Sequence, residues 1–265
     1  MAEFQSWNEY HIFADFVKHK ARYVLDERSK RFLQVVLETS EKRKMLLPGK
    51  STLWRAQLAH DLRTVLVPPL MQAAFGGVTE YLAPHPCSGH RMLPFLDRAT
   101  EGRVNPKGIP CMYFAMDGRT AMSEVRPWMG SYISVAQLTT FKALQLVDCA
   151  ADELGHSVNY YSACMEPSAD ERERCVWEHM NVAFSEPVTR SDDVADYAPT
   201  QVLAETFRDG GYDGIVYESR LGEGGKNVAT FGLDYAELVS CSLYQVDEIR
   251  FEFTPACTEG HPKAG

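Results

Sequence analysis

The hydrophobic period of the sequence changes at Pro48-Gly49, and this change most constrains what the chain can fold into. Before it, apolar residues recur at helical spacing in two stretches, and the basic run at residues 41–44 fits the end of the second helix. After it, short apolar runs of strand length alternate with helical stretches and with turns rich in glycine and proline. We therefore expect residues 1–50 to form a helical hairpin that covers a following mixed domain.

The second part of the chain contains several runs typical of strands. They are residues 53–56, 111–116, 132–138, 144–149, 215–218, 228–231 and 249–253. Between the first two lies a stretch at 84–110 that is rich in Pro, Gly, His and Arg and predicts a long loop. The GEGGKN sequence at 222–227 favours a tight hairpin loop over a backbone nest that approaches a phosphate. Residues 254–265 predict a polar tail.

Three further stretches of this part predict helices. Residues 120–125 form a short one, and residues 199–208 form a longer one that begins with proline. Ser168 is followed three positions later by Glu171, which is the pattern of a capping box. This pair predicts the start of a helix that runs through Trp177.

The composition excludes several classes of protein. With 265 residues, 45% of them hydrophobic, the chain is long and apolar enough to bury a core. Its net charge of −9 is a poor match for nucleic acid. No apolar run approaches the ~18 residues of a membrane span, and the acidic start does not resemble a signal peptide. The seven scattered cysteines, never spaced as CxxC, indicate free thiols in a cytoplasm.

His85, Cys87 and His90 are the residues that most resemble metal ligands. Zn²⁺ accepts both ligand types, and the three lie within six residues. No fourth ligand follows at a suitable spacing, and the segment is rich in proline. We therefore expect no metal site.

The most informative region begins with the GRVNPKG sequence at 102–108. It is followed by Tyr113 on an expected strand and by Glu124 on an expected short helix. Together with Arg103, these residues supply a cation, an aromatic face and a carboxylate within about twenty positions. Such a set suits a ligand that contains a phosphate, a planar cationic ring and a sugar.

Several motifs then occur in the order typical of one family. GRVNPKG, MYFA, TAMSEVRP and the long YAPTQVLAETFRDGGYDGIVYESRLGEGGKNVATF resemble the RES-domain family, and the upstream LWRAQ resembles its opening strand. The resemblance covers roughly residues 50–232. Members of this family are bacterial toxins, usually encoded beside an Xre-like antitoxin.

The resemblance implies an α+β fold like that of the ADP-ribosyltransferases, with a split mixed β-sheet and flanking helices. In this interpretation residues 1–50 are an N-terminal helical extension, residues 51–253 are the RES domain, and 254–265 are a tail. The resemblance also implies NAD⁺ as a substrate that is cleaved between nicotinamide and ribose, with no further cofactor.

The resemblance places the functional residues one by one. The family's glutamate corresponds to Glu124, its serine to Ser219 and its tyrosine to Tyr113. Its arginine corresponds to either Arg103 or Arg55, and we retain both. Asn227 is a weaker member of the expected pocket.

Each of these residues has a chemical role that suits NAD⁺ cleavage. A carboxylate at Glu124 stabilises an oxocarbenium-like ribose as nicotinamide departs. The planar forks of Arg103 and Arg55 suit a pyrophosphate. Tyr113 can stack on the nicotinamide ring, and Ser219 can hold the ribose or the carboxamide by a hydrogen bond.

The sequence says less about the molecule that accepts ADP-ribose. Arginine-modifying relatives present a glutamate pair as ExE, whereas this chain has Met122-Ser123-Glu124. The lone glutamate favours water or inorganic phosphate as the acceptor. The alternatives are transfer to a protein, or a non-catalytic domain that binds a nucleotide or a partner. The expected partner is an Xre-like antitoxin that occludes the cleft, and the oligomeric state stays open.

Overall fold

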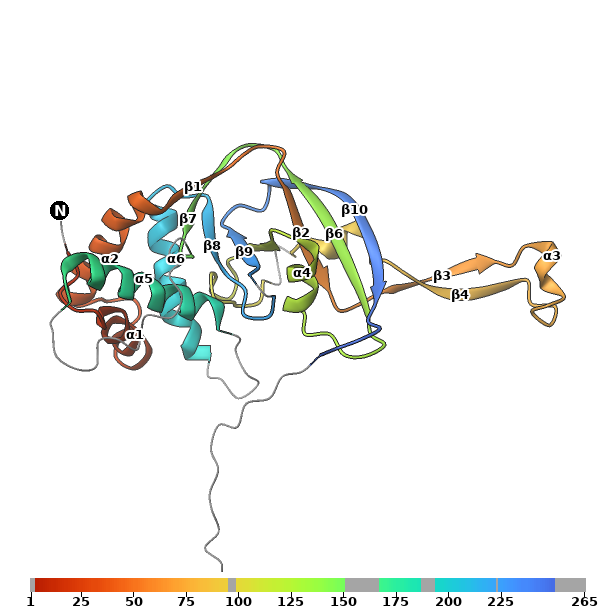
Figure 1. The fold of residues 1–265 in the computed structure, drawn as a ribbon, viewed down its shortest axis with the longest axis horizontal. Coiled ribbons are helices and arrows are strands. Elements are labelled where there is room, and N and C mark those ends of the chain that lie inside the picture. Colours follow the sequence, from red (N-terminus) through yellow and green to blue (C-terminus); the bar gives the residue numbers. More distant parts are fainter. Residues whose placement is uncertain (1–2, 95–98, 151–166, 187–193, 223, 251–265) are drawn as a thin grey trace, which may run out of the picture.

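A computed structural model describes residues 3–94, 99–150, 167–186, 194–222 and 224–250. Its main feature is an eight-stranded sheet with the order β1-β7-β8-β9-β5-β2-β6-β10 (Figure 1). Only β7 and β8 run parallel; the other neighbours are antiparallel. The strands are β1 (Lys44–Leu47), β2 (Thr52–Gln57), β5 (Met112–Ala115), β6 (Tyr132–Thr140), β7 (Leu144–Asp148), β8 (Gly214–Glu218), β9 (Lys226–Thr230) and β10 (Ala236–Gln245).

The sheet is split between β5 and β2. These two strands are joined at a single register pair, Trp54 opposite Ala115, whereas β2 pairs with β6 along its whole length. One half is therefore β1-β7-β8-β9-β5, and the other is β2-β6-β10. The expected α+β fold with a split mixed sheet is confirmed.

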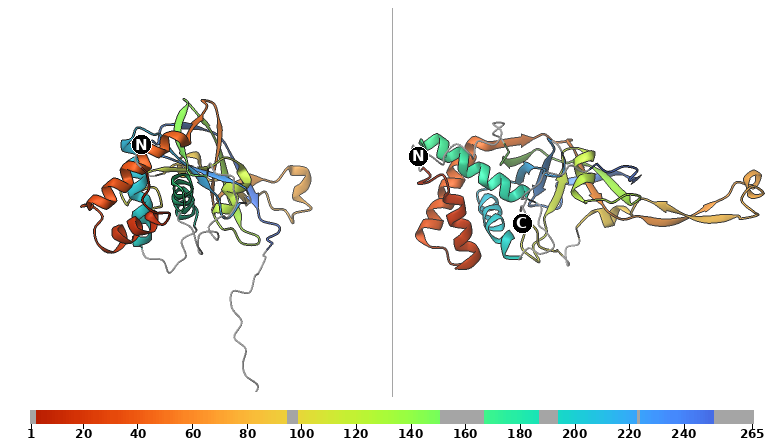
Figure 2. Two further views of the ribbon diagram at one scale, coloured as in Figure 1. Left: turned by 60° about the vertical axis from the view of Figure 1, so that its left-hand side comes forward. Right: turned by 60° about the horizontal axis from the view of Figure 1, so that its bottom comes forward.

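Helices cover one face of the first half of the sheet. They are α1 (Glu9–His19), α2 (Glu27–Ser40), α5 (Ala169–Ser185) and α6 (Ala198–Asp209), which lie together at one end of the molecule (Figures 1 and 2). Strand alternation explains why this half has two cores. Ile215 packs under the helices, whereas its neighbour Val216 packs into a second apolar cluster. Helix α4 (Gly118–Glu124) lies instead against β2, β5 and β6, beside the split.

Most of the expected elements are present. The helix predicted from Ser168 and Glu171 begins with a complete capping box, and it extends beyond Trp177 to Ser185. Gly222, Gly224 and Gly225 lie in the loop of the expected β8–β9 hairpin, and Lys226 and Asn227 are the first residues of β9. The last expected strand is not formed at residues 249–250, and residues 251–265, with the expected tail, lie outside the described residues.

The N-terminal segment differs from the expectation at its end. Helices α1 and α2 form the helical pair that covers the domain, and α2 begins at the N-cap Asp26, whose side chain accepts from the Ser29 amide at 2.8 Å. The basic run does not end that helix. Helix α2 stops at Ser40, a 3₁₀ turn (η1, Glu41–Arg43) follows, and Lys44 starts β1. Because β1 pairs with β7, the first fifty residues also supply an edge strand of the main sheet.

A long β-hairpin projects from the body of the molecule. It consists of β3 (Asp61–Leu66) and β4 (Glu80–His85), with the short helix α3 (Pro69–Gln72) near its tip (Figures 1 and 2). We call residues 61–85 the arm. The sequence analysis did not predict it, and β4 takes the first residues of the expected loop at 84–110. Its base is held by Asp61, which accepts from the Ser88 amide at 3.0 Å and from Arg91.

We expect the arm to contribute little to the stability of the body, since its strands pair with each other and lie away from the main sheet. Replacing residues 64–82 with Asn-Gly gives a short hairpin on the same base. The loss in free energy of unfolding should stay below roughly 1 kcal/mol. Since such a loss lowers the melting temperature of a domain of this size by about 2–4 °C, the melting temperature should stay within about 2 °C of wild type. Thermal unfolding followed by circular dichroism measures this. The core variant Val36→Ala serves as the destabilised reference, and a comparable loss in the shortened protein would contradict the expectation.

Candidate functional site

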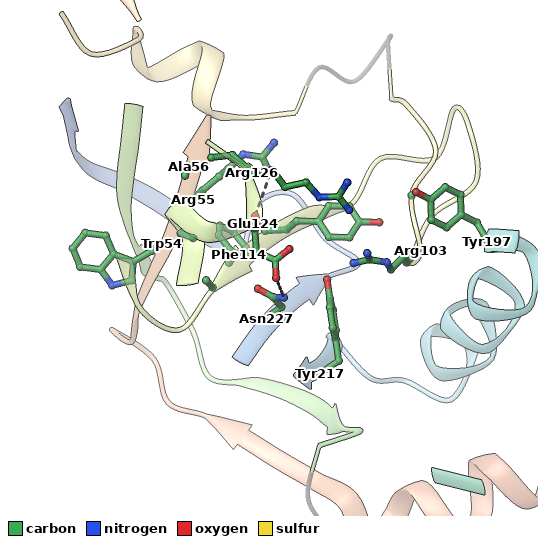
Figure 3. A pocket seen from close by; sticks show the side chains of 15 residues that line it. Trp54, Arg55, Ala56, Arg103, Phe114, Glu124, Arg126, Tyr197, Tyr217 and Asn227 are labelled. Atoms are coloured by element: carbon green, nitrogen blue, oxygen red, sulfur yellow. Dashed lines mark hydrogen bonds between the residues drawn. The ribbon is translucent and has the colours of Figure 1, made fainter. Parts of the chain in front are cut away.

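A pocket of about 400 Å³ opens where β2 and β5 separate (Figure 3). Strand β2 and strand β5 form two of its walls, and α4, β8 and β9 supply further side chains. Its lining residues are Trp54, Arg55, Ala56, Gly102, Arg103, Tyr113, Phe114, Ala115, Ala121, Glu124, Val125, Arg126, Tyr197, Tyr217 and Asn227. All the site residues expected from the sequence except Ser219 are among them.

Arg55 bridges the split. Since β2 and β5 diverge, the carbonyl of Tyr113 accepts from the Arg55 guanidinium, with 3.1 Å between Nη1 and the oxygen. The Arg55 Nε is buried and has no hydrogen-bond partner among the described residues. Burial lowers the pKa of Arg55, with the nearby Tyr113 acting in the opposite direction. Arginine is protonated at neutral pH, so the pocket holds a half-buried positive charge with an unused donor.

Glu124 lies at the C-terminal end of α4, whose N-cap Asp117 accepts from the Thr120 amide at 2.8 Å. One carboxylate oxygen of Glu124, Oε1, accepts from the Ser219 hydroxyl at 2.7 Å and from the Asn227 amide nitrogen at 2.7 Å. Within the described residues, Oε2 accepts no hydrogen bond. Two donors therefore fix the carboxylate by one oxygen and leave the other available to a ligand (Figure 3).

Ser219 holds the Glu124 carboxylate in place by a hydrogen bond. It follows the end of β8, and its oxygen accepts from the Gly222 amide at 2.9 Å while its proton goes to Glu124. Its side chain does not line the pocket. In this structure the Ser219 hydroxyl holds the Glu124 carboxylate in position, and the interpretation that it binds the ribose or the carboxamide stays a prediction.

The glycines of the β8–β9 loop allow a close approach to α4. A Cβ added to Gly225 would lie 2.0 Å from the Thr120 Oγ1, and one added to Gly222 would lie 2.9 Å from the same atom. Real Cβ atoms essentially never come that close, so these positions require glycine. This close approach of the loop to Thr120 on α4 lets Ser219 and Asn227, which flank the loop, reach Glu124. Of the residues at 222–227 that the structure describes, Asn227 alone lines the pocket, which does not favour a phosphate nest.

The GRVNPKG loop is built around two buried polar side chains. The Tyr113 hydroxyl donates to Asn105 Oδ1 at 2.6 Å and accepts from the Val104 amide at 3.1 Å. The Asn105 amide nitrogen donates to the carbonyls of Thr100 and Ile109. Burial raises the pKa of Tyr113, so its hydroxyl stays protonated at neutral pH. Tyr113 therefore uses its hydroxyl to hold the loop, and its ring is the part that lines the pocket.

Arg103 is presented by this loop on the opposite side of the pocket from Trp54 (Figure 3). Gln201 on α6 fixes the turn by donating to the carbonyls of Gly102 and Asn105, at 2.9 and 3.1 Å. The Arg103 guanidinium donates to the main-chain carbonyl of Glu186. Both candidate arginines thus line the same pocket as Glu124, and both can contact a ligand there.

The sequence analysis missed five aromatic or charged residues of the pocket: Trp54, Phe114, Arg126, Tyr197 and Tyr217. The signal for Tyr217 was its place in the same motif, two positions before Ser219 and near the end of β8. Burial raises the pKa of Tyr217 to about 12, and Arg103 opposes that effect. The backbone of Arg126 has a φ of 48°, which the sequence does not indicate.

The described residues show neither a metal cluster nor a membrane helix. Among them no group of three or more His, Cys, Asp or Glu side chains could hold a metal ion. Cys87 of the HPCSGH sequence is buried, and its amide donates to the Ser134 hydroxyl at 2.9 Å. In the same residues, no helix is long and apolar enough to cross a bilayer.

We expect Gly225→Ala to destabilise the protein by about 1–3 kcal/mol, because the new methyl group overlaps Thr120. Thr120→Ala removes the overlapping atoms, so the double variant should recover part of the loss. Urea unfolding of the two single variants and the double variant gives the coupling energy. Additive losses would show that the loop does not depend on this contact.

Three comparisons relate the chain to known proteins. Residues 52–254 match the family model described as the RES domain. A search of curated proteins gave no match. Among solved structures, the MbcT–MbcA toxin–antitoxin complex of M. tuberculosis is similar, with 13% identity and a TM-score of 0.39 over 84% of this chain and 94% of that chain.

Proposed function

The chain belongs to the RES-domain family, and we propose on that premise that it cleaves NAD⁺ between nicotinamide and ribose. The main support for the proposal is the way in which the Glu124 carboxylate is hydrogen-bonded. Its carboxylate is held at Oε1 by Ser219 and Asn227, and its Oε2 is left available beside a pocket that contains two arginines. The family match covers the strands and loops that supply all these residues.

Glu124 stabilises the transition state in this proposal. The bond between the ribose carbon and the nicotinamide nitrogen breaks, and nicotinamide leaves as a neutral molecule with the bonding electrons. The ribose then carries positive charge, as in glycoside cleavage. A carboxylate fixed beside this charge stabilises it without reorganising, and Oε2 can also accept a hydrogen bond from a ribose hydroxyl.

The two arginines suit the pyrophosphate of the substrate. A pyrophosphate carries two negative charges, and planar guanidinium groups bind such oxygens in pairs. The Arg55 Nε and the Arg103 Nε are both buried without a partner among the described residues. An unpaired buried donor is costly, so a ligand that accepts from it gains binding energy.

Water or inorganic phosphate completes the reaction. Attack by water on the ribose carbon gives ADP-ribose and releases one proton, whereas attack by phosphate gives a phosphorylated ADP-ribose. The lone glutamate of the Met122-Ser123-Glu124 sequence supports these acceptors over arginine side chains. Transfer of ADP-ribose to a protein is the alternative.

An enzyme that consumes NAD⁺ damages its own cell unless it is controlled. We therefore propose that the protein is a toxin and that an Xre-like antitoxin blocks the pocket between β2 and β5. The support is the family resemblance and the open position of the pocket in this chain.

Time-resolved NMR of NAD⁺ with the purified protein, with and without phosphate, tests the proposed activity. Release of nicotinamide in either condition supports it, and the second product identifies the acceptor. Labelled NAD⁺ distinguishes transfer to a protein, because the label then stays with polypeptide. Unchanged NAD⁺ in all conditions would contradict the proposal.

We expect Glu124→Gln to reduce NAD⁺ cleavage by a factor on the order of 10²–10³, because the neutral amide cannot stabilise the charged ribose. Gln keeps the size of the side chain, so the melting temperature should be preserved. Nicotinamide release measures the rate, and Glu205→Gln on the exposed side of α6 is the matched control. A folded Glu124→Gln protein with wild-type turnover would refute the assignment.

Ser219→Ala should lower kcat roughly 10- to 100-fold and leave KM nearly unchanged. The reason is that Ser219 binds the Glu124 carboxylate and does not line the pocket, and a hydrogen bond to a charged group contributes about 1.5–3 kcal/mol. Steady-state kinetics separates the two constants. The control is Ser123→Ala, whose hydroxyl donates instead to the Arg119 carbonyl. A rise in KM alone would point to direct substrate contact by Ser219.

A further inference from the structure

A second pocket adjoins the first one. It has a volume of about 360 Å³ and lies between α1, α5 and the 3₁₀ turn η4 (Val194–Tyr197). Arg103 and Tyr197 line both pockets, so the two meet at these side chains. A ligand that occupied both pockets would pass these two side chains.

The walls of this second pocket suit a flat ring. Aromatic side chains of α1, α5 and η4 alternate with small apolar ones such as Ala14 and Ala183. The rings of His11 and His179 lie 4.3 Å apart between centroids, and they bring α1 and α5 together at the pocket. A planar heterocycle can stack on such surfaces.

The polar groups of the pocket suit a neutral base better than a phosphate. Lys18 is already paired with Asp196 at 2.7 Å, and Glu186 adds a second carboxylate. Burial, with His11 nearby, lowers the pKa of His179 to about 4, so its ring is neutral at pH 7. The positive and negative side chains that line this pocket therefore balance in charge, and this balance does not favour binding of an additional anion.

His179 has an unmet hydrogen bond. It is 7% exposed, and its Nδ1 is buried without a partner among the described residues. A purine offers both ring-nitrogen acceptors and an exocyclic amine donor, so it can pair with this nitrogen in either tautomer and with a neighbouring carboxylate.

We propose that the second pocket binds the adenine ring of the dinucleotide, with Arg103 on the pyrophosphate between the two pockets. This proposal rests on the proposed function and extends it to the other end of the substrate. Helix α1 precedes residues 52–254, which the family model matches, yet it supplies His11 and one wall of the pocket. The N-terminal segment is then part of the substrate site as well as a cover for the core.

Binding of AMP to the full chain, measured by isothermal titration calorimetry, tests the proposal without any catalytic step. Wild type should bind AMP, and His11→Ala and His179→Leu should weaken binding by roughly 5- to 100-fold, the range expected for losing one stacked aromatic contact. His19→Ala is the matched control, because His19 lies on the same helix, pairs with Asp15 and does not line the pocket.

The outcomes separate this proposal from the proposed function. If NAD⁺ is not cleaved but the AMP pattern is as expected, the activity is wrong and the adenine pocket stands. The proposal is overturned if wild type does not bind AMP, or if His11→Ala binds it as tightly as His19→Ala. His11 is exposed, so its variant decides the question even where His179→Leu fails to fold, which thermal unfolding would reveal.

Discussion

The single register pair between Trp54 and Ala115 is the constraint on which the rest of the structure depends. Where a sheet continues, backbone groups satisfy one another; where β2 and β5 diverge, that pairing is lost and the carbonyl of Tyr113 needs another donor. Arg55 provides it from the adjacent strand. The split is thus stabilised by a cation, and the same cation becomes part of the pocket that the split creates.

The two loops that carry the site are held by specific contacts on either side of this opening. The GRVNPKG loop is held by the hydrogen bond between Tyr113 and its own Asn105, and by the hydrogen bonds that Gln201 of α6 donates to it. The β8–β9 loop depends on glycines that fit against Thr120. These contacts link motifs that lie far apart in the sequence, because Ser219 of one motif fixes Glu124 of another, and Gln201 fixes the GRVNPKG turn.

The sequence predicted the strands of the central sheet because their alternating apolar residues face two cores. It did not predict the arm, whose strands are mostly exposed. It also missed β10, which alternates half-buried with exposed residues, contains no fully buried one and has a register shift between Leu238 and Ser240. Strand β1 was missed because its four residues follow a helix directly. Arg55, Arg103, Tyr113, Glu124 and Asn227 were found through the motifs, but the position of Ser219 behind Glu124 depends on a turn that the sequence does not reveal.

The central claim is that the split in the sheet is the substrate site, with Glu124 at the ribose. A crystal structure of the Glu124→Gln protein with NAD⁺ tests it most directly. The account predicts the nicotinamide ribose beside residue 124 in the pocket between β2 and β5, with the pyrophosphate within hydrogen-bond distance of Arg55 or Arg103. NAD⁺ bound elsewhere on the molecule, with this pocket unoccupied, would contradict it.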